Sequence, residues 1–419
     1  MIRNHRRPTG ASRKEAALRS FGSGTRVPTL AAVLDIIRER TTVSRVELAE
    51  ATGLTQATMT RAVRKLLAMG FVHEVGTARS NGGKPRRLLE LQPEAHYQVG
   101  IQFDRFASVG VVVDLAGRIV ARREMPGPGE RRPREVLAEF AETVRSMLDA
   151  ASIDRSNVLG IGLATHGPQD REAGVLLTPQ PTPEWLRFPV AATLADLTGL
   201  PVVIENDATA AGIGLQARGD SASSFAVVFM SGGIGSGLII DGHPYRGSTS
   251  NGLELGHISV DATGPRCDCG NRGCVDNVAS PTAIARQAAA NPELVARLGL
   301  GRDPLSDFSS VGRAAIAGDP DAAALILLSA QRLSIATVSL VNLFDIGRVV
   351  LAGSAFAETG AVYRDAVQQV LDESVFMRHV HGTRVELADN LTEAAAIGGA
   401  VVVLRNRLES PTVGDWAAI

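Results

Sequence analysis

The residues that most directly suggest chemistry are one histidine and three cysteines. Cys267, Cys269 and Cys274 are all the cysteines of the chain, and His257 lies ten residues before the first of them. Three thiolates and one imidazole complete the tetrahedral ligand set of a structural zinc site, and glycines among them allow the sharp turns of a metal-binding loop. Buried or redox cysteines are the alternative. A disulfide framework is disfavoured because the number is odd and no secretory signal is found.

Such a loop must be held by a larger fold, and charge divides the chain into two parts. Residues 1–90 carry 17 Lys/Arg against 7 Asp/Glu, whereas the rest carries 26 against 37. A basic head on an acidic body suggests a polyanion-binding module joined to a different domain. Residues 1–25 are expected to be a flexible basic tail. No apolar run reaches the roughly 18 residues of a membrane span, so we expect a cytoplasmic protein.

Residues 26–92 have the pattern of a winged helix-turn-helix domain. Residues 27–40 have helical apolar periodicity. Ser44 and Glu47 form a capping-box pattern for a second helix, which should end at Gly53. A third helix is expected over 55–69. Two short helices joined by a glycine turn are typical of helix-turn-helix proteins, in which the second helix enters the major groove.

A predicted hairpin completes this head. Strands are expected at 70–75 and 88–91, around a basic tip at 79–87 that would form a wing. Glutamine and arginine can bond base edges, while threonine and lysine suit phosphates. A plain three-helix scaffold with solvated charges is the alternative. The predicted DNA-binding residues are Ser44, Thr55, Gln56, Thr58, Thr60, Arg61, Arg64, Lys84 and Arg86.

Strands alternate with helices in the body, which predicts an α/β fold. The expected strands are 99–103, 108–114, 119–125, 158–164, 201–205, 225–230, 238–240 and 348–352. The expected helices are 133–150, 281–317, 321–343 and 394–404.

Several motifs of the body together resemble one known family. The signature lies in Gly256-His257, the cysteine loop and Gly273-Cys274-Val275-Asp276, with supporting matches at 161–168, 205–208, 233–237 and 396–399. Residues 96–408 in this way resemble the ROK family of repressors, open reading frames and sugar kinases. The resemblance implies a two-lobed, actin-like or hexokinase-type (ribonuclease H-like) fold. The small α/β lobe would comprise 96–208 plus 393–408, and the large α/β lobe 209–392 with the zinc loop.

The resemblance also implies a sugar bound between the lobes. Carboxylates and amides suit sugar hydroxyls because they accept or donate several hydrogen bonds within a shaped pocket. The family usually has Glu at the last of these positions, so the shorter Asp276 puts that contact in doubt. Whether Trp185 stacks on the sugar or belongs to the core is left open. The implied sugar-binding residues are Asn206, Asp207, Glu254, His257 and Asp276.

Kinases of the family would use Asp207 as the general base. They would also cradle nucleotide phosphates with backbone N–H groups of glycine-rich turns. The first such turn, Asp-x-Gly-Gly-Thr, corresponds here to Phe103-Asp104-Arg105-Phe106-Ala107, which lacks both glycines. Gly232 stands where the second turn usually has Thr, and residues 352–354 lack the paired glycines of the adenosine side. We therefore expect a sensor and no enzyme activity.

The function expected from these observations is a sugar-responsive DNA-binding transcriptional regulator, in particular a repressor of carbohydrate genes. Its expected partners are operator DNA, a sugar or sugar-phosphate effector, a structural Zn²⁺ and a second copy of the chain, with a tetramer also possible. It would lie in the cytoplasm, at the nucleoid when bound to DNA. An ATP-dependent kinase of hexoses or N-acetylhexosamines with a DNA-binding head is the alternative. A third hypothesis has a partner protein control DNA release.

Overall fold

The computed structural model describes residues 29–78, 86–218 and 223–409. The described chain forms two compact units. The first contains residues 29–97 with 114–118 and 404–409, and the second contains 98–113 and 119–403. The tail expected at 1–25, the tip of the wing and Lys84 lie outside the described residues.

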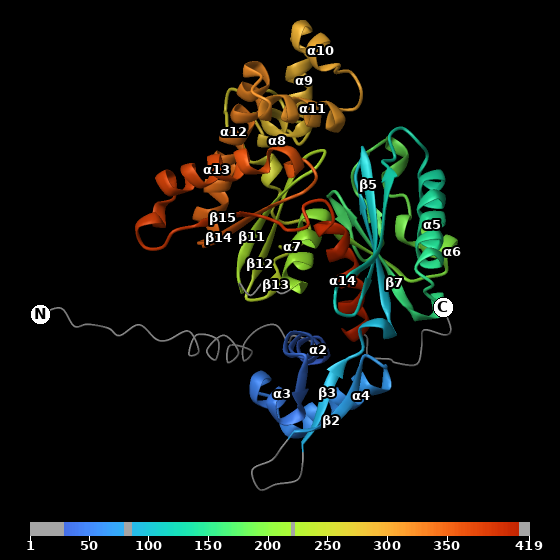
Figure 1. Ribbon diagram of the computed structural model, residues 1–419. Coiled ribbons are helices and arrows are strands. Elements are labelled where there is room, and N and C mark those ends of the chain that lie inside the picture. Colours follow the sequence, from blue (N-terminus) through green and yellow to red (C-terminus); the bar gives the residue numbers. More distant parts are fainter. Residues whose placement is uncertain (1–28, 79–85, 219–222, 410–419) are drawn as a thin grey trace, which may run out of the picture. The chain divides into compact units, whose positions relative to one another are not determined.

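The first unit contains the winged helix-turn-helix (Figure 1). Its three-stranded sheet has the order β1-β3-β2, and β3 pairs antiparallel with both neighbours. The predicted capping box is present, because Ser44 accepts from the N–H of Glu47 while the Glu47 carboxylate accepts from the N–H of Ser44. Gly53 ends that helix with a φ of 68°, as the turn requires. The elements are α2 (Thr29–Arg40), β1 (Thr42–Ser44), α3 (Arg45–Thr52), α4 (Gln56–Ala68), β2 (Val72–Ala78) and β3 (Arg86–Leu91).

The second unit contains two five-stranded sheets. The first has the order β10-β7-β4-β5-β6, in which β10 and β7 are parallel and β5 and β6 antiparallel. Helices α5 and α6 pack together beside it (Figure 1). The bounds are β4 (Tyr97–Phe103), β5 (Ala107–Asp114), β6 (Ile119–Pro126), α5 (Pro133–Ala150), β7 (Val158–Thr165), α6 (Val190–Thr198) and β10 (Val202–Asn206), with short strands β8 (Gln169–Asp170) and β9 (Val175–Leu176).

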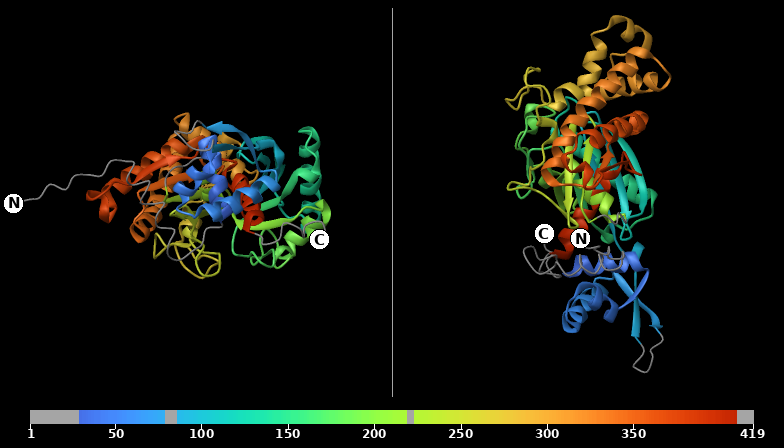
Figure 2. Two further views of the ribbon diagram at one scale, coloured as in Figure 1. Left: turned by 90° about the horizontal axis from the view of Figure 1, so that it is seen from below. Right: turned by 90° about the vertical axis from the view of Figure 1, so that its left-hand side faces the viewer.

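The second sheet has the order β13-β12-β11-β14-β15, with β11, β14 and β15 parallel and β12 antiparallel to β11. Helices α8 to α13 build an apolar core with it, and α9 to α11 gather at one end of the unit (Figure 2). The bounds are β11 (Phe225–Met230), β12 (Ile234–Ile240), β13 (His243–Pro244), α8 (Val275–Ala279), α9 (Pro281–Ala289), α10 (Pro292–Leu298), α11 (Pro304–Ile316), α12 (Pro320–Phe344), β14 (Arg348–Ala352), α13 (Phe356–Ser374) and β15 (Arg384–Leu387).

Two small-residue helices, α7 (Asp207–Ala217) and α14 (Ala394–Glu409), lie between the sheets (Figure 1). They share one core with residues of β5, β11, β12 and β14. Their backbones approach closely, since a methyl group on Gly398 would lie 1.7 Å from the carbonyl oxygen of Ala210. Likewise, a methyl group on Gly237 of β12 would lie 2.2 Å from the carbonyl oxygen of Ala208. Gly235 and Gly237 are therefore strand residues that admit α7.

The fold class expected from the sequence is confirmed, but several elements were not predicted. Helices α6, α7, α8 and α13 and strand β15 were missed, and β12 is longer than expected. Helix α12 is long and apolar enough to span a membrane by length and composition alone. Half of its apolar window is buried within the protein, as in the core helix of a globular domain.

Replacing Gly398 with alanine should destabilise the second unit by about 2 kcal/mol or more, because the new methyl group overlaps the backbone of α7. Urea unfolding followed by circular dichroism measures the effect. Gly382→Ala is the matched control, since a methyl group there meets nothing within 4 Å. Equal unfolding midpoints for the two variants would contradict this packing.

Candidate functional site

The four candidate metal ligands lie together in the structure. One ligand atom from each of His257, Cys267, Cys269 and Cys274 lies within 4.8 Å of the others. The Cys267 Sγ atom is 3.6 Å from His257 Nδ1, and the Cys269 and Cys274 Sγ atoms are 3.7 Å apart. A tetrahedral zinc site has edges of roughly 3.6 Å for S–N and 3.8 Å for S–S pairs, from its usual bond lengths. The cluster therefore suits a metal ion of this kind.

The loop that carries these ligands is closed by its own backbone. Short bridges pair Ser259 with Cys274 and Arg266 with Arg272. Gly273 has a φ of 58°, and a methyl group there would lie 1.8 Å from the carbonyl oxygen of Asp261. Burial raises the pKa of the Cys274 thiol to about 12. Since a coordinating thiol is deprotonated, a bound cation would supply the charge that keeps this buried sulfur as a thiolate.

Three polar side chains from two segments of the chain converge on Gly167. A methyl group placed on Gly167 would lie 3.1 Å from Glu254 Oε1, 3.5 Å from Asn206 Nδ2 and 3.8 Å from Asn251 Oδ1. Asn206 ends β10 and caps α7, accepting the N–H of Thr209 through Oδ1 at 2.9 Å. Its amide nitrogen is thus left on the side of Gly167. Glu254 directly precedes the short helical turn Leu255–His257.

Asp207 begins α7 and belongs to an acidic group. Burial is the largest cause that raises the pKa of its carboxyl to about 7; the N–H of Ala208 opposes the rise, and the carboxylates of Asp104 and Glu254 add to it. Loss of water around its carboxylate raises the pKa of Glu254, with Asp276 adding to the effect and His257 opposing it. Hydrogen bonds from uncharged donors stabilise buried carboxylates of this kind, and sugar hydroxyls are such donors.

Asp276 lies at the start of α8, and one of its two carboxylate oxygens already has a hydrogen-bond partner within the protein. Its Oδ1 accepts the N–H of Ile234 at 2.8 Å. Burial raises the pKa of its carboxyl, and this hydrogen bond opposes the rise. One carboxylate oxygen is therefore used to hold the turn between β11 and β12, which leaves less of the group for a ligand.

Beside Glu205, which belongs to the matched motif 205–208, the structure also reveals residues that sequence patterns did not single out. Asn251 accepts the N–H of Gln169 at 2.7 Å and donates to its carbonyl oxygen at 3.0 Å. Buried Glu205 pairs with both Arg171 and Arg246. No local pattern marks these residues, because each works through a partner far away in the chain. Trp185 is fully buried with its ring 4.8 Å from that of Phe103, so it belongs to the core.

Residues 103–107, where kinases of the family have their first phosphate-binding turn, place the side chains of Asp104 and Phe106 against the turn between β11 and β12. Asp104 is 8% exposed, and its carboxylate accepts the N–H of Phe106 at 3.0 Å and that of Gly232 at 3.2 Å. A methyl group on Gly232 would lie 3.0 Å from the ring of Phe106. The Phe106 ring thus packs against the turn that joins β11 and β12.

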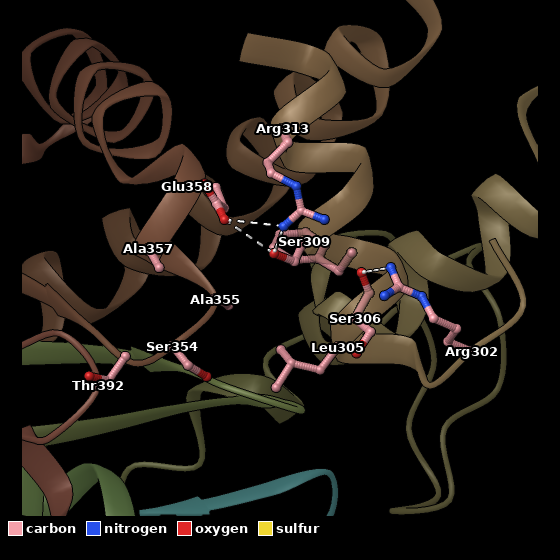
Figure 3. A pocket seen from close by; sticks show the side chains of 11 residues that line it. Arg302, Leu305, Ser306, Ser309, Arg313, Ser354, Ala355, Ala357, Glu358 and Thr392 are labelled. Carbon is pink, nitrogen blue, oxygen red and sulfur yellow. Dashed lines mark hydrogen bonds and ion pairs between the residues drawn. The ribbon is translucent and has the colours of Figure 1, made fainter. Parts of the chain in front are cut away.

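A cavity of about 310 Å³ lies between α11 and α13, beside Ser354 (Figure 3). Arg313 crosses it to Glu358 at 3.3 Å and donates to Ser309 at 2.9 Å. Arg302 donates to Ser310 at 2.7 Å. The cavity adjoins the turn that the family resemblance assigns to adenosine, but it contains neither Asp207 nor the residues around Gly167.

The predicted DNA-binding residues of α4 divide into two groups. Gln56, Arg61 and Arg64 are exposed. The threonines have partners inside the helix, because Thr55 accepts the N–H of Thr58 and Thr60 donates to the carbonyl oxygen of Gln56. The opposite face of α4 is buried through Met59, Ala62, Val63 and Leu66. The three long polar side chains are therefore the ones that can reach a groove.

Of the two other predicted DNA contacts that the structure describes, Ser44 is buried and Arg86 is exposed. Ser44 is 1% exposed and its hydroxyl belongs to the capping box, so its role is to begin α3 rather than to face outward. Arg86 is exposed on the wing. The wing is tied to the start of α3 by Glu74, which pairs with Arg45 at 2.8 Å and with Arg87.

The raised pKa of Asp207 predicts a pH dependence of stability. The folded protein holds this proton more tightly than the unfolded chain, so the contribution is full at low pH and is lost as pH rises to about 7. The wild type should therefore lose more unfolding free energy between pH 5 and pH 7 than Asp207→Asn does. Urea titrations of both proteins measure this difference, and parallel curves over that range would show the assignment to be wrong.

Comparison with known proteins gives matches to both units. The sequence model of the ROK family matches residues 99–406, and that of the MarR family matches residues 28–74. A protein named xylose repressor from Bacillus subtilis is 30% identical over 258 residues, covering 61% of this chain and 66% of that protein. Another xylose repressor, from Caldicellulosiruptor bescii, is 24% identical over 389 residues, covering 90% and 96%.

Solved structures give the same picture. A ROK family transcriptional regulator, described as a homologue of the E. coli MLC protein, superposes with a TM-score of 0.72 at 23% identity, covering 91% of this chain and 98% of that chain. A ROK family glucokinase from Streptomyces griseus, in complex with glucose and AMPPNP, gives a TM-score of 0.59 at 25% identity, covering 73% and 98%. The chain belongs to the ROK family, with a MarR-type winged helix-turn-helix followed by a hexokinase-like ROK domain.

Proposed function

We propose that the chain is a sugar-responsive DNA-binding repressor of carbohydrate genes. The observation that carries this proposal is the presence in one chain of an exposed recognition-helix face and a group of hydroxyl-binding side chains. The xylose repressors that it resembles, one of them over 90% of this chain, support the same function. The DNA-binding residues would be Gln56, Arg61, Arg64 and Arg86, with Lys84, Thr55, Thr58 and Thr60 toward phosphates.

The sugar would bind near Gly167, between the end of β10 and the turn at residues 254–257. Asp207 and Glu254 would accept hydroxyl hydrogens, and the Asn206 amide nitrogen would donate to a hydroxyl oxygen. Asp276 would contribute one carboxylate oxygen, since the other holds Ile234. The carboxylates act on one another here, because Asp104 and Glu254 raise the pKa of Asp207, and Asp276 raises that of Glu254. An unphosphorylated sugar is therefore favoured over a sugar phosphate.

The metal of the His257 cluster would be a structural Zn²⁺. Three cysteines and one histidine are the usual closed set, with no position left for chemistry. His257 would bind zinc through Nδ1, the atom nearest Cys267, and present its other ring nitrogen to a sugar hydroxyl. In this way the metal would fix one wall of the sugar site.

We also propose that the chain is not a sugar kinase, although Asp207 is suitable as a general base. Phosphoryl transfer needs backbone N–H groups directed at the nucleotide phosphates. At the turn between β11 and β12, Ser231 donates to the carbonyl oxygen of Gly233, Gly232 to Asp104, and Ile234 to Asp276. These donors have protein partners, and the Phe106 ring occupies the approach to Gly232.

Control of DNA binding would follow from closure of the two lobes around the sugar. Closure would change the surfaces that position the two heads of a homodimer, so that the heads no longer match half-sites separated by whole helical turns. We expect the sugar to release the DNA. The opposite sign, in which sugar strengthens DNA binding, would appear in the same assay as a shift to lower protein concentration.

A mobility-shift assay tests the proposal. With DNA from upstream of neighbouring sugar genes, the protein should bind at moderate salt, and one of D-xylose, D-glucose or N-acetylglucosamine should weaken binding. Arg64→Ala should weaken DNA binding by about tenfold, because an exposed guanidinium on the recognition helix is lost, without changing sugar affinity. Arg123→Ala, an exposed arginine of β6, is the matched control. Equal loss in both variants, or no DNA binding at all, would contradict the proposal.

Removal of one metal ligand gives a separate test. Cys274→Ser should lower the bound zinc, measured by atomic absorption, and weaken sugar binding, because a ligand and the buried loop are both lost. DNA affinity in the absence of sugar should stay within about threefold, since α2 to α4 contain no metal ligand. Unchanged zinc content in this variant would exclude the assigned cluster.

A further inference from the structure

We infer that Asp104 and Phe106 form a latch on the turn between β11 and β12 (residues 231–234, the latch turn), which links the sugar site to the first sheet without a nucleotide. The inference rests on the proposed function, because it gives the latch a role in sugar sensing. Its first part, that the latch holds the turn, can be tested in the absence of any sugar.

Two carboxylates, from different segments of the chain, accept hydrogen bonds from the latch turn. From the end of β4, the Asp104 carboxylate accepts the N–H of Gly232 at 3.2 Å. From the start of α8, the Asp276 carboxylate accepts the N–H of Ile234 at 2.8 Å. Asp276 lies two residues after the metal-cluster ligand Cys274. One short turn therefore joins the first sheet to the metal loop through two charged hydrogen bonds, which are stronger than neutral ones.

The segment that carries Asp104 and Phe106 is held by hydrogen bonds of its own. Asp104 also accepts the N–H of Phe106 at 3.0 Å, and the Phe106 carbonyl oxygen accepts the N–H of Gly127 at 3.1 Å. The ring leaves room at Gly232 for a hydrogen atom only, since a methyl group would lie 3.0 and 3.1 Å from two ring carbons. It would also lie 3.4 Å from the Asp104 carboxylate.

The chemistry of this contact is that of an anion on a backbone donor, which is also how a turn holds a phosphate. Here the anion belongs to the chain itself, so the turn is held closed with no bound nucleotide. Asp104 lies close enough to Asp207 to raise the pKa of its carboxyl. Asp276 gives the direct connection, because its Oδ1 holds the N–H of Ile234 in the latch turn and its other carboxylate oxygen is left for a sugar hydroxyl. A sugar bound to Asp276 would therefore be linked through the latch turn to Asp104 and the first sheet.

Gly232→Ala tests the latch by inserting one methyl group between the turn and Phe106. Gly232 has no positive φ, so the substitution adds crowding without backbone strain. In the sugar-free protein, amide hydrogen exchange of the peptide 230–236 should become about fivefold faster. Sugar affinity, measured by calorimetry with whichever of D-xylose, D-glucose and N-acetylglucosamine binds the wild type, should fall about tenfold.

Rescue separates a latch from a general loss of structure. Phe106→Ala combined with Gly232→Ala makes room for the methyl group, so exchange and sugar affinity should return to within about threefold of Phe106→Ala alone. Gly347→Ala is the control, because its methyl group meets only a ring atom of His381 at 4.0 Å. Normal zinc content in Gly232→Ala would show that the metal loop is intact.

Two results would overturn the latch: Gly232→Ala behaving like Gly347→Ala in hydrogen exchange, or a double variant that stays as defective as Gly232→Ala. If the wild type binds none of the sugars, the proposed function fails. The hydrogen-exchange comparison would still decide whether Asp104 and Phe106 hold the turn.

Discussion

The close packing of α7 against α14 and β12 is the constraint on which the rest of the site depends. Glycines at 398 and 237 let the backbones meet where any side chain would overlap the carbonyl oxygens of Ala210 and Ala208. This contact fixes α7 between the two sheets, and the N-terminus of α7 is where Asn206 and Asp207 lie. The position of Asn206 and Asp207 is thus set by backbone packing in the first turn of the same helix.

The kind of ligand that suits the site depends on the charge of its carboxyl groups. Asp104, Asp207, Glu254 and Asp276 form an acidic surrounding, and burial raises the pKa of three of them, Asp207, Glu254 and Asp276. Such groups favour neutral hydroxyl donors and disfavour a further anion. The turn that would have to bind phosphates donates its N–H groups to Asp104 and Asp276 instead. In the proposed function, the same carboxylates would favour a sugar and oppose a nucleotide.

Local signals explain what could be predicted from the sequence. Ser44, Glu47 and Gly53 act within one or two helical turns, so the head's helices were predicted with nearly their observed ends. Four metal-ligand residues within eighteen positions likewise indicated a shared cluster. Helix α13 was missed, and Gly360 inside it is explained only by the packing of Leu387, 3.0 Å from where its methyl group would lie.

Long-range partners explain what could not be predicted. Asp104 meets Gly232 across 128 positions and Asn251 meets Gln169 across 82, and no spacing rule connects such pairs. Ser44 was expected both in the capping box and at the DNA, and its hydroxyl is used by the cap. The assignments of individual residues to sugar, zinc and DNA are predictions that the geometry supports and that experiments must decide.

We propose that the ROK domain of this chain binds sugar without a nucleotide. Isothermal titration calorimetry of the binding sugar, with and without Mg-ATP, tests it most directly. The account predicts saturable binding whose dissociation constant changes by less than about twofold when Mg-ATP is present, with no heat for Mg-ATP alone. Sugar binding that requires Mg-ATP, or conversion of the sugar to a sugar phosphate during the titration, would contradict it.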